Sequence, residues 1–272
     1  MTNDYRIILA PNSSLLTGAG TNTIIVGSQS TGAIVIDPAE GNPEYLAAIV
    51  QEGRLRGGIQ RILVTHGHPD HIGGATSLRA QLNIPILAFS RQGVPFADEE
   101  IADGATFPVG DDSLRAIYTP GHRFDHLCFL LEKQRTLFAG DLLASSTTVV
   151  IPPPPEGDLV DYMDSLRRVQ SLNIAEIIPA HGQIITNPQE KLAEYIAHRQ
   201  KREQQLLTLL SSNAQGVDIH TLVQVIYVAT DTRLHALAAL SVAAHLHKLE
   251  REGKVKQVNS EQDGQPDYWV LV

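Results

Sequence analysis

One segment of seven residues (65–71), Thr-His-Gly-His-Pro-Asp-His, constrains this chain more than any other feature. It brings three histidines and an aspartate together directly after an apolar run that is typical of a buried strand. Imidazole and carboxylate groups are the ligands that proteins use for zinc and similar divalent ions. Alternate residues of an extended segment point to the same side, so we expect His66 and His68 to share one ion. Asp70 and His71 lie where a helix is expected to begin, and they can serve a second ion.

Three more residues with ligand side chains follow strand-like runs. His122 comes after Thr-Pro-Gly, Asp141 after Phe-Ala-Gly and His181 after Ile-Pro-Ala. A single histidine at the end of a strand is usually an ordinary polar residue, but three further candidates at three strand ends are hard to explain in that way. A metal site at the edge of packed sheets would take one ligand from each strand end. We therefore expect all these side chains to converge on one site.

The first 190 residues predict a layered arrangement of sheets with helices outside. The expected strands cover residues 6–9, 23–26, 33–37, 61–65, 86–89, 114–119, 126–131, 136–139 and 174–178, and the expected helices cover residues 43–50, 70–82 and 159–172. The four prolines of residues 152–155 predict a stiff extended loop that could shape the substrate site.

The order of the motifs, His-x-His-x-Asp-His, Gly-His, Gly-Asp and a histidine beside a glycine, resembles that of the metallo-β-lactamase superfamily across roughly residues 5–190. The resemblance implies the α/β fold class, in the form of a four-layer αββα sandwich. It also implies that two metal ions are bound and that Asp141 bridges them. The implied ligands are His66, His68 and His122 for one ion and Asp70, His71 and His181 for the other.

Two such ions imply a hydrolytic mechanism. Divalent ions about 3.5–4 Å apart can share a hydroxide whose pKa is lowered toward neutrality, so we expect a metal-bridging hydroxide as the nucleophile. Asp70 is the predicted catalytic residue, because its second carboxylate oxygen could accept the proton of the nucleophile. Ligation by nitrogen and oxygen alone suits zinc best, with manganese and iron as alternatives. The sequence assigns no residue to substrate binding.

The last third of the chain predicts a second, smaller domain. A long helix is expected from residue 190, followed by a break at residues 213–216. The expected elements after the break are helices over residues 217–228 and 233–252 and strands over residues 254–258 and 268–272. Helices followed by a small hairpin are the pattern of a winged helix. We therefore expect a catalytic domain in residues 1–212 and a winged-helix domain in residues 213–272.

This tail extends the resemblance to nearly the whole chain. Residues 195–205, Tyr-Ile-Ala-His-Arg-Gln-Lys-Arg-Glu-Gln-Gln, resemble the inter-domain helix of the β-lactamase-like protein 2 family. Residues 246–254 resemble part of its C-terminal domain. Members of that family include single-strand-selective endoribonucleases. The resemblance therefore favours a phosphodiesterase of the endoribonuclease type, with single-stranded RNA as its substrate.

Other functions stay open. A glyoxalase II-like thioesterase, of the hydroxyacylglutathione hydrolase type, shares the motifs around His122 and Asp141, and a small ester is a related substrate. A non-enzymatic winged-helix binding protein is less favoured, because all seven implied ligands are present. The net charge of −9 counts against a nucleic acid partner, as do the seven Lys and Arg against eight Asp and Glu from Lys201 onward.

The resemblance also argues against two activities. The branch that hydrolyses antibiotics generally lacks an aspartate where this chain has Asp141. The di-iron branch that reduces oxygen typically has glutamate where this chain has His68. We therefore expect neither β-lactamase nor redox activity.

Cellular location and assembly are predicted from simpler features. Cys128 is the only cysteine, so no disulfide can form within the chain. The first six residues do not resemble a signal peptide, and no stretch approaches the roughly 20 apolar residues of a membrane span. We expect a cytoplasmic protein without a membrane partner. The apolar second helix of the tail is expected to wall the active-site cleft or to form the surface of a homodimer.

Three residues allow two interpretations each. Asp37 could orient a ligand histidine or be an ordinary turn residue. His126 could be a strand residue without a function, or it could support a ligand or contact the substrate. His198, on the long helix, could face the cleft or be a plain surface residue.

Overall fold

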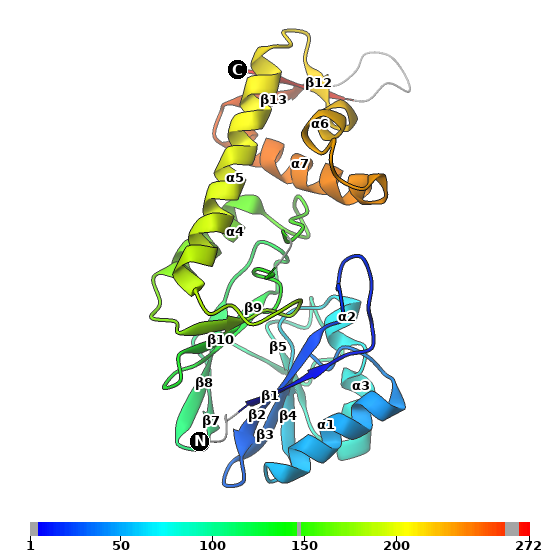
Figure 1. Ribbon diagram of the computed structural model, residues 1–272, viewed down its shortest axis with the longest axis vertical. Coiled ribbons are helices and arrows are strands. Elements are labelled where there is room, and N and C mark those ends of the chain that lie inside the picture. Colours follow the sequence, from blue (N-terminus) through cyan, green and yellow to red (C-terminus); the bar gives the residue numbers. More distant parts are fainter. Residues whose placement is uncertain (1–4, 146–147, 259–266) are drawn as a thin grey trace.

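The computed structural model describes residues 5–145, 148–258 and 267–272. Figure 1 shows a layered lower part joined by one long helix to a smaller upper part. The expectation that no signal peptide is present rests partly on residues 1–4, which lie outside the described residues. Within the described ranges, no helix is long and apolar enough to cross a membrane.

The first sheet of the lower part has six strands, arranged side by side in chain order. They are β1 (Tyr5–Leu9), β2 (Asn22–Ser28), β3 (Gly32–Ile36), β4 (Ile59–Leu63), β5 (Ile86–Ala88) and β6 (Glu99–Glu100). Helices α1 (Pro43–Leu55) and α3 (Ala75–Leu82) cover its outer face (Figure 1). Pro43 stands in the first turn of α1, and the side chain of Asn42 accepts hydrogen bonds from two backbone N–H groups there.

The second sheet has five strands in the order β11-β10-β9-β8-β7. They are β7 (Thr106–Val109), β8 (Asp112–Tyr118), β9 (Leu127–Leu131), β10 (Thr136–Phe138) and β11 (Glu176–Ile178). Helix α4 (Leu159–Gln170) and the first half of α5 (Pro188–Ser211) cover its outer face. The sequence predicted neither β6 nor β7, because both strands are short. Both residues of β6 are exposed, and every second residue of β7 is exposed.

Alternation along the strands explains the layers. In β3, Ala33 and Val35 pack toward α1, whereas Ile34 and Ile36 pack between the two sheets. This alternation follows from the two-residue period of a strand, and it makes both faces of the central strands apolar. Burying one such branched side chain contributes about 1.5–3 kcal/mol. The resulting order of helices, sheet, sheet and helices confirms the predicted four-layer αββα sandwich.

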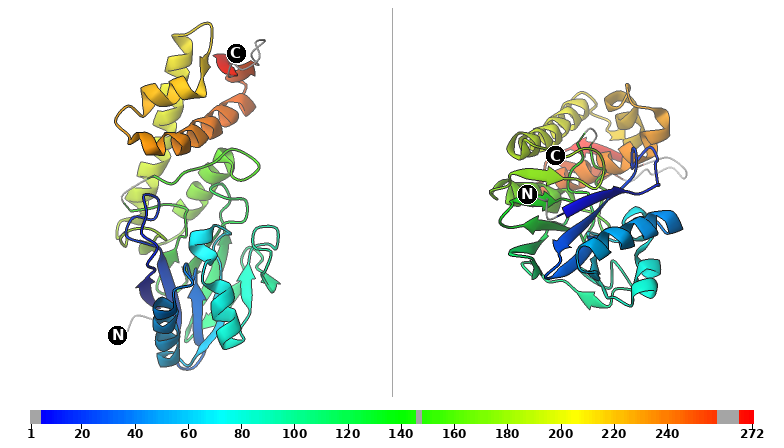
Figure 2. Two further views of the ribbon diagram at one scale, coloured as in Figure 1. Left: turned by 90° about the vertical axis from the view of Figure 1, so that its right-hand side faces the viewer. Right: turned by 60° about the horizontal axis from the view of Figure 1, so that its bottom comes forward.

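The upper part is the predicted winged helix (Figure 2). It consists of β12 (Val217–Asp218), α6 (Ile219–Ile226), a 3-10 turn (Thr232–Leu234), α7 (His235–Arg251), β13 (Val255–Val258) and β14 (Tyr268–Leu271). The expected helix over residues 217–228 begins two residues late, because Val217 and Asp218 pair with β14 and the Asp218 side chain caps α6. Trp269 is the largest buried side chain of this domain's apolar core.

Helix α5 contributes to both cores. Leu192 and Tyr195 pack in the core of the lower part, and Leu206 and Leu210 pack around Trp269 in the upper part. The domain division after residue 212 stays a prediction.

The predicted helix over residues 70–82 is wrong in one respect, because it is broken into α2 (Pro69–Ile72) and α3. The break falls at Gly73 and Gly74, where the chain passes against residues 38–40. A Cβ atom on Gly74 would lie 2.3 Å from the carbonyl oxygen of Glu40, so no larger residue fits there. The break leaves Asp70 and His71 on a separate short helix, α2.

Candidate metal centre

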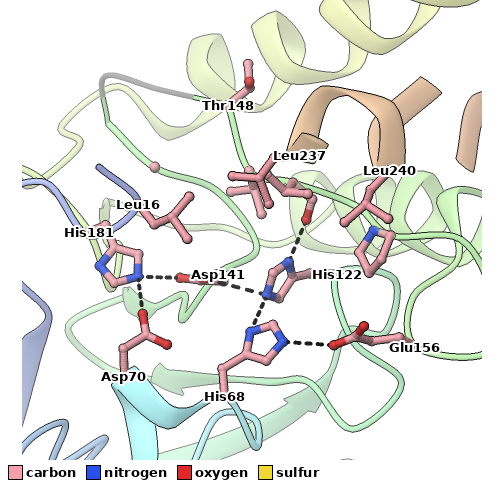
Figure 3. Close-up of a pocket in the computed structure, with 14 residues that line it drawn as sticks. Leu16, His68, Asp70, His122, Asp141, Thr148, Glu156, His181, Leu237 and Leu240 are labelled. Atoms are coloured by element: carbon pink, nitrogen blue, oxygen red, sulfur yellow. Dashed lines mark hydrogen bonds and ion pairs between the residues drawn. The ribbon is translucent and has the colours of Figure 1, made fainter. Parts of the chain in front are cut away.

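Four strand ends deliver the predicted ligands to one place. His66 and His68 follow β4, and Asp70 and His71 lie on α2 directly after them. The segments that follow β8, β10 and β11 supply the others, which are His122, Asp141 and His181. Figure 3 shows five of these side chains, His68, Asp70, His122, Asp141 and His181, pointing toward one another at the floor of a pocket. The sequence prediction that strand-end residues converge is therefore confirmed as a geometric statement.

The first group of candidate ligands consists of three imidazoles. The Nε2 atom of His66 lies 2.9 Å from Nδ1 of His68, and that atom lies 3.1 Å from Nε2 of His122. These three atoms and a carboxylate oxygen of Asp141 lie within 4.8 Å of one another. Such a set of nitrogen and oxygen atoms suits a divalent ion.

The second group lies beside the first and consists of Asp70, His71 and His181. Nε2 of His181 is 3.4 Å from Oδ2 of Asp70, and Nε2 of His71 is 3.9 Å from the same oxygen. Asp141 stands between the groups. Its Oδ1 lies 3.3 Å from His181 and 3.6 Å from His71, whereas its Oδ2 lies 3.6 Å from His122.

One buried atom tests whether a cation fits this place. Nε2 of His71 is buried and has no hydrogen-bond partner, although the carboxylates of Asp70 and Asp141 lie close by. A buried polar atom without a partner is costly and calls for an explanation. A positive ion bound between this nitrogen and the two carboxylates would supply the missing partner. The residues present therefore fit a metal ion.

Asp37 holds His71 in its position. The Asp37 side chain accepts hydrogen bonds from the backbone N–H of Thr65 at 2.8 Å and from the Thr65 hydroxyl at 2.7 Å. Its Oδ2 also lies 2.7 Å from Nδ1 of His71, which leaves Nε2 of that ring directed at the site. Of the two interpretations of Asp37, the structure supports the one in which it orients a ligand histidine.

Two contacts from the proline-rich loop orient the outer ligands. Nδ1 of His122 lies 2.7 Å from the carbonyl oxygen of Val150, and Nε2 of His68 lies 3.2 Å from a carboxylate oxygen of Glu156 (Figure 3). The loop predicted from residues 152–155 therefore borders the site. The sequence did not predict Glu156 as a site residue, because a glutamate after four prolines forms no recognisable motif.

His126 supports Asp141 from below. The backbone N–H of Asp141 donates a 3.0 Å hydrogen bond to Nε2 of His126, and the Thr119 hydroxyl lies 2.9 Å from its Nδ1. The ring is fully buried, and burial lowers the pKa of His126 to about 3. A neutral ring is the form that can accept this hydrogen bond. His126 therefore supports a ligand, as one of its two interpretations proposed.

Two imidazoles of the first group, those of His66 and His122, are kept neutral. Burial, together with the nearby His71, lowers the pKa of His66 well below its usual value. Burial also lowers the pKa of His122. Metal binding requires an unprotonated nitrogen, so these two rings do not have to lose a proton when an ion binds.

The second group behaves in the opposite way. Burial opposes protonation of His71, but Asp37 and then Asp141 raise its pKa well above the usual value. Burial likewise opposes protonation of His181, but hydrogen bonds with Asp141 and Asp70 raise its pKa to about 9. Burial alone would raise the pKa of Asp141, yet the neighbouring histidines hold it well below normal. In the metal-free chain, protons therefore occupy the place that suits a cation, and an ion must displace them.

The candidate ligands form one end of a pocket of about 260 Å³. Apart from the ligands, it is lined by Leu16, Ala144, Thr148, Val149, Val150, Pro152, Glu156, Leu237 and Leu240. Leu237 and Leu240 belong to α7 of the winged helix and point down toward the metal ligands (Figure 3). No Lys or Arg occurs among these described lining residues. The winged-helix domain therefore walls the cleft, which is one of the two roles that the sequence predicted for its second helix.

The comparisons with known families agree with this description. The sequence matches the Metallo-beta-lactamase superfamily over residues 16–181 and the Beta-lactamase associated winged helix domain over residues 219–269. The chain therefore belongs to the metallo-beta-lactamase superfamily, and as an enzyme it is a metallo-hydrolase.

Full-length relatives narrow this assignment. The chain is 33% identical to the Beta-lactamase-like protein 2 homolog of Drosophila melanogaster, in an alignment that covers 94% of this chain and 91% of that protein. It is 34% identical to the homolog of Caenorhabditis elegans, with 93% and 86% covered. It is also 30% identical to the Lactamase-like protein aptB of Emericella nidulans, with 91% and 81% covered. The predicted resemblance to the β-lactamase-like protein 2 family is confirmed.

Solved structures confirm the fold of both domains. A metallo-beta-lactamase family protein from Thermus thermophilus matches with a TM-score of 0.80 at 21% identity, covering 99% of both chains. A Beta-lactamase domain protein from Burkholderia ambifaria matches with a TM-score of 0.84 at 17% identity, covering 99% of this chain and 91% of the other. At these identities the match extends to the fold alone.

Proposed function

We propose that this protein hydrolyses an ester or thioester bond in a small substrate that carries an apolar group beside that bond. One observation carries the proposal: beyond the candidate ligands, seven of the nine described residues that line the pocket are apolar, and none is Lys or Arg. An acyl chain would bury apolar surface against Leu16, Val149 and Leu237, at about 25 cal/mol per Å² of area buried. A phosphodiester backbone would find no cation there except the metal ions.

The proposal assigns the candidate ligands to two ions. His66, His68 and His122 would hold one ion, and Asp70, His71 and His181 the other. Asp141 would bridge them, and the support is that its two carboxylate oxygens face different groups of histidines. Zinc is the ion that suits these nitrogen and oxygen ligands best, with manganese and iron as alternatives.

When bound, such ions supply an activated water molecule and polarise the carbonyl oxygen of the substrate. The protein side chains carry the remaining work. His126, Asp37 and Glu156 fix the orientations of Asp141, His71 and His68. The aliphatic lining places the acyl carbon against the ligands and keeps bulk water away from it.

Asp70 is the proposed proton acceptor. Its side chain is 31% exposed and borders the pocket, whereas Asp141 is only 14% exposed. One oxygen of Asp70 faces His181, so the other could take a proton from the attacking water. With excess metal, so that both proteins are compared at full occupancy, replacing Asp70 with Asn should reduce kcat by about 100-fold or more. An unchanged kcat at full metal occupancy would remove Asp70 from this role.

Single-stranded RNA is the second candidate substrate. It is supported by the resemblance to the β-lactamase-like protein 2 family over both domains. Two features weigh against it, which are the acidic composition of the chain and the position of Glu156 beside His68 at the mouth of the pocket. A cytoplasmic location and a homodimer remain part of the proposal, and the dimer would have to use a surface other than the α7 face that lines the pocket.

One experiment separates the two substrates. Zinc-loaded protein is assayed on an acyl thioester, on the matching oxygen ester and on a single-stranded oligoribonucleotide. We expect turnover of the esters that is lost in Asp141→Ala and retained in His247→Ala, a histidine far along α7 that borders neither group of ligands. Cleavage of RNA without ester turnover would overturn the proposal and establish the second candidate.

A further inference from the structure

A second pocket adjoins the one at the metal centre. It has a volume of about 210 Å³ and lies between the long helix α5 and the start of the winged helix. Five residues line both pockets, which are Leu16, Thr148, Val149, Val150 and Leu237. The two pockets therefore adjoin, and four of the five residues at their shared border are apolar. The far section, which is the part of the second pocket away from this border, is bordered by His198, Arg199 and Tyr227.

Arg199 is the unusual residue of the far section. It is only 3% exposed, and its Nε has no hydrogen-bond partner. No carboxylate in the described part of the chain lies within 4.0 Å of its guanidinium group. Glu203, one turn further along α5, is instead paired with Lys248 at 3.0 Å.

The contacts that Arg199 does make are neutral. One of its Nη atoms donates a hydrogen bond to the carbonyl oxygen of Val149, and its guanidinium carbon lies 5.2 Å from the centre of the Tyr162 ring. These contacts offset part of the cost of burying the positive charge. A buried charge without an opposite charge nevertheless remains costly, and the pocket is the side from which an anion could reach Arg199.

His198 adds a hydrogen-bonding group beside this charge. It lines the same pocket, and its Nδ1 is buried without a partner. Burial, followed by the neighbouring Arg199 and Arg202, lowers the pKa of His198, so the ring is neutral. The far section therefore offers one positive charge and one neutral polar ring. This supports the interpretation of His198 in which it faces a cleft.

We propose that the Arg199 pocket binds the carboxylate end of the substrate, while the bond to be hydrolysed lies at the metal centre. This inference rests on the proposed function and specifies its substrate class. The substrate would be an amphiphile with an ester or thioester at one end, an apolar section against Leu16, Val149 and Leu237, and a carboxylate at the other end.

The single charge of the pocket selects a carboxylate over a phosphate. Arg199 is the only cation among its described lining residues, and a carboxylate carries one negative charge that a guanidinium can bind through two hydrogen bonds. A phosphate monoester carries a charge of about −1.5 to −2 at pH 7, which one guanidinium neutralises only in part. Arg202 does not line this pocket; its guanidinium group lies over the Tyr227 ring, 4.3 Å from the ring centre.

An activity measurement tests this inference. Zinc-loaded protein is given pairs of thioesters of equal length that end either in a carboxylate or in the corresponding methyl ester. Wild-type kcat/KM should favour the carboxylate by about 10- to 100-fold, because a hydrogen bond to a charged group contributes about 1.5–3 kcal/mol and 1.4 kcal/mol is a factor of ten. In Arg199→Gln the ratio should fall to about 1, and Arg199→Lys should restore part of it.

The matched control is Lys201→Gln, which removes one positive charge from an exposed position on the same helix and should keep the wild-type ratio. If Arg199 only supports Val149, Arg199→Gln would reduce turnover of both substrates equally and leave the ratio unchanged. That result, or a wild-type ratio near 1, would overturn the inference.

A binding measurement gives a result that does not depend on hydrolysis. The melting temperature of metal-free wild-type protein is followed with straight-chain monocarboxylates, with the corresponding primary alcohols and with alkyl phosphates of equal length. We expect the carboxylates to stabilise the wild type and Lys201→Gln more than the alcohols do, and to lose this advantage in Arg199→Gln. Carboxylate binding without any ester hydrolysis would contradict the proposed function alone. Equal effects of acids and alcohols, or stronger binding of the phosphates, would overturn the carboxylate pocket itself.

Discussion

His71 in the catalytic domain and His245 in the winged-helix domain are buried to the same degree, with 0% and 1% of each residue exposed. Nε2 of His71 and both ring nitrogens of His245 lack a hydrogen-bond partner. The charges around the two rings differ. His71 lies among the carboxylates of Asp37, Asp70 and Asp141, whereas His245 lies between α5 and α7 near Glu203 and two arginines.

The difference arises from the elements that carry the two rings. Ends of neighbouring strands lie side by side, so ligands that follow β4, β8, β10 and β11 can converge on one point. Side chains on a helix diverge, and His245 and His247 of α7 point to different sides, one buried and one 41% exposed. Buried histidines therefore form a metal centre only where strand ends supply several of them together with carboxylates.

The largest effect is expected from removing the carboxylate shared by both groups of ligands. Asp141→Ala should reduce kcat/KM for the ester substrate by about 1000-fold or more, since metal ions contribute several kcal/mol to the transition state. Elemental analysis of the dialysed protein should show loss of bound metal. Full metal content with near-normal turnover would contradict the view that the strand-end ligands around His71 form a metal centre.

In the winged-helix domain, His245 is expected to make the stability of the protein depend on pH. Burial, opposed by Glu203 and reinforced by Arg199, lowers the pKa of His245 to about 4, while an unfolded histidine has a pKa of about 6.5. The unfolded chain then binds more protons between these values. The stability contributed by the neutral ring is complete above pH 6.5 and is lost as the pH falls toward 4. Replacing His245 with Leu should therefore reduce this acid-induced loss by about 2–3 kcal/mol.

Urea unfolding of the wild type and of His245→Leu between pH 7 and pH 4, at equal metal content, measures this difference. Parallel stability curves for the two proteins would show that His245 is already charged in the folded state. Its burial would then have to be stabilised by Glu203 in the way that Asp37 stabilises His71.

A smaller effect is expected from the carboxylate that orients His71. Asp37→Asn keeps the shape of the side chain but removes the charge beside Nδ1 of His71. Metal affinity should fall by about 10- to 100-fold, as found when the partner of a ligand histidine is lost. Competition with a chromogenic chelator measures the affinity. Asp103→Asn, at a surface pair with Arg168, is the control and should leave it unchanged.

The smallest effect is expected for the exposed histidine of α7. His247 forms a 3.7 Å contact with Glu250 at the surface, and such pairs contribute little. His247→Ala should change the unfolding free energy by less than about 0.5 kcal/mol and leave metal binding and turnover unaltered. A large loss of stability would show that the contact of the ring with Trp269, at 5.6 Å between centroids, matters more than its exposure suggests.

The ligand set could be predicted because each member is adjacent to a strand in the sequence, so strand pairing alone brings it to the site. The supporting residues could not be predicted in the same way. Glu156 reaches His68 across 88 positions of the chain, and Val150 orients His122 through a backbone oxygen that any residue could offer. Arg199 lies on a helix whose sequence pattern marks it as an ordinary polar position. Its burial depends on how α5 packs against the loop at Val149, and this tertiary contact cannot be read from the local sequence.

The continuity of α5 has a mechanical consequence. Helix α5 runs without a break from Leu192 in one core to Leu210 in the other, so no loop between them could act as a hinge. The helix therefore holds the winged helix rigidly against the sandwich (Figure 1). A second attachment lies at the other end of α7, where Arg251 and Asp158 form a 2.6 Å ion pair. Two attachment points resist rotation where one would allow it. The distance between the candidate ligands and the side chains of Leu237 and Leu240 is therefore fixed when the chain folds. This fixed distance limits the size of the substrates that the pocket can accept.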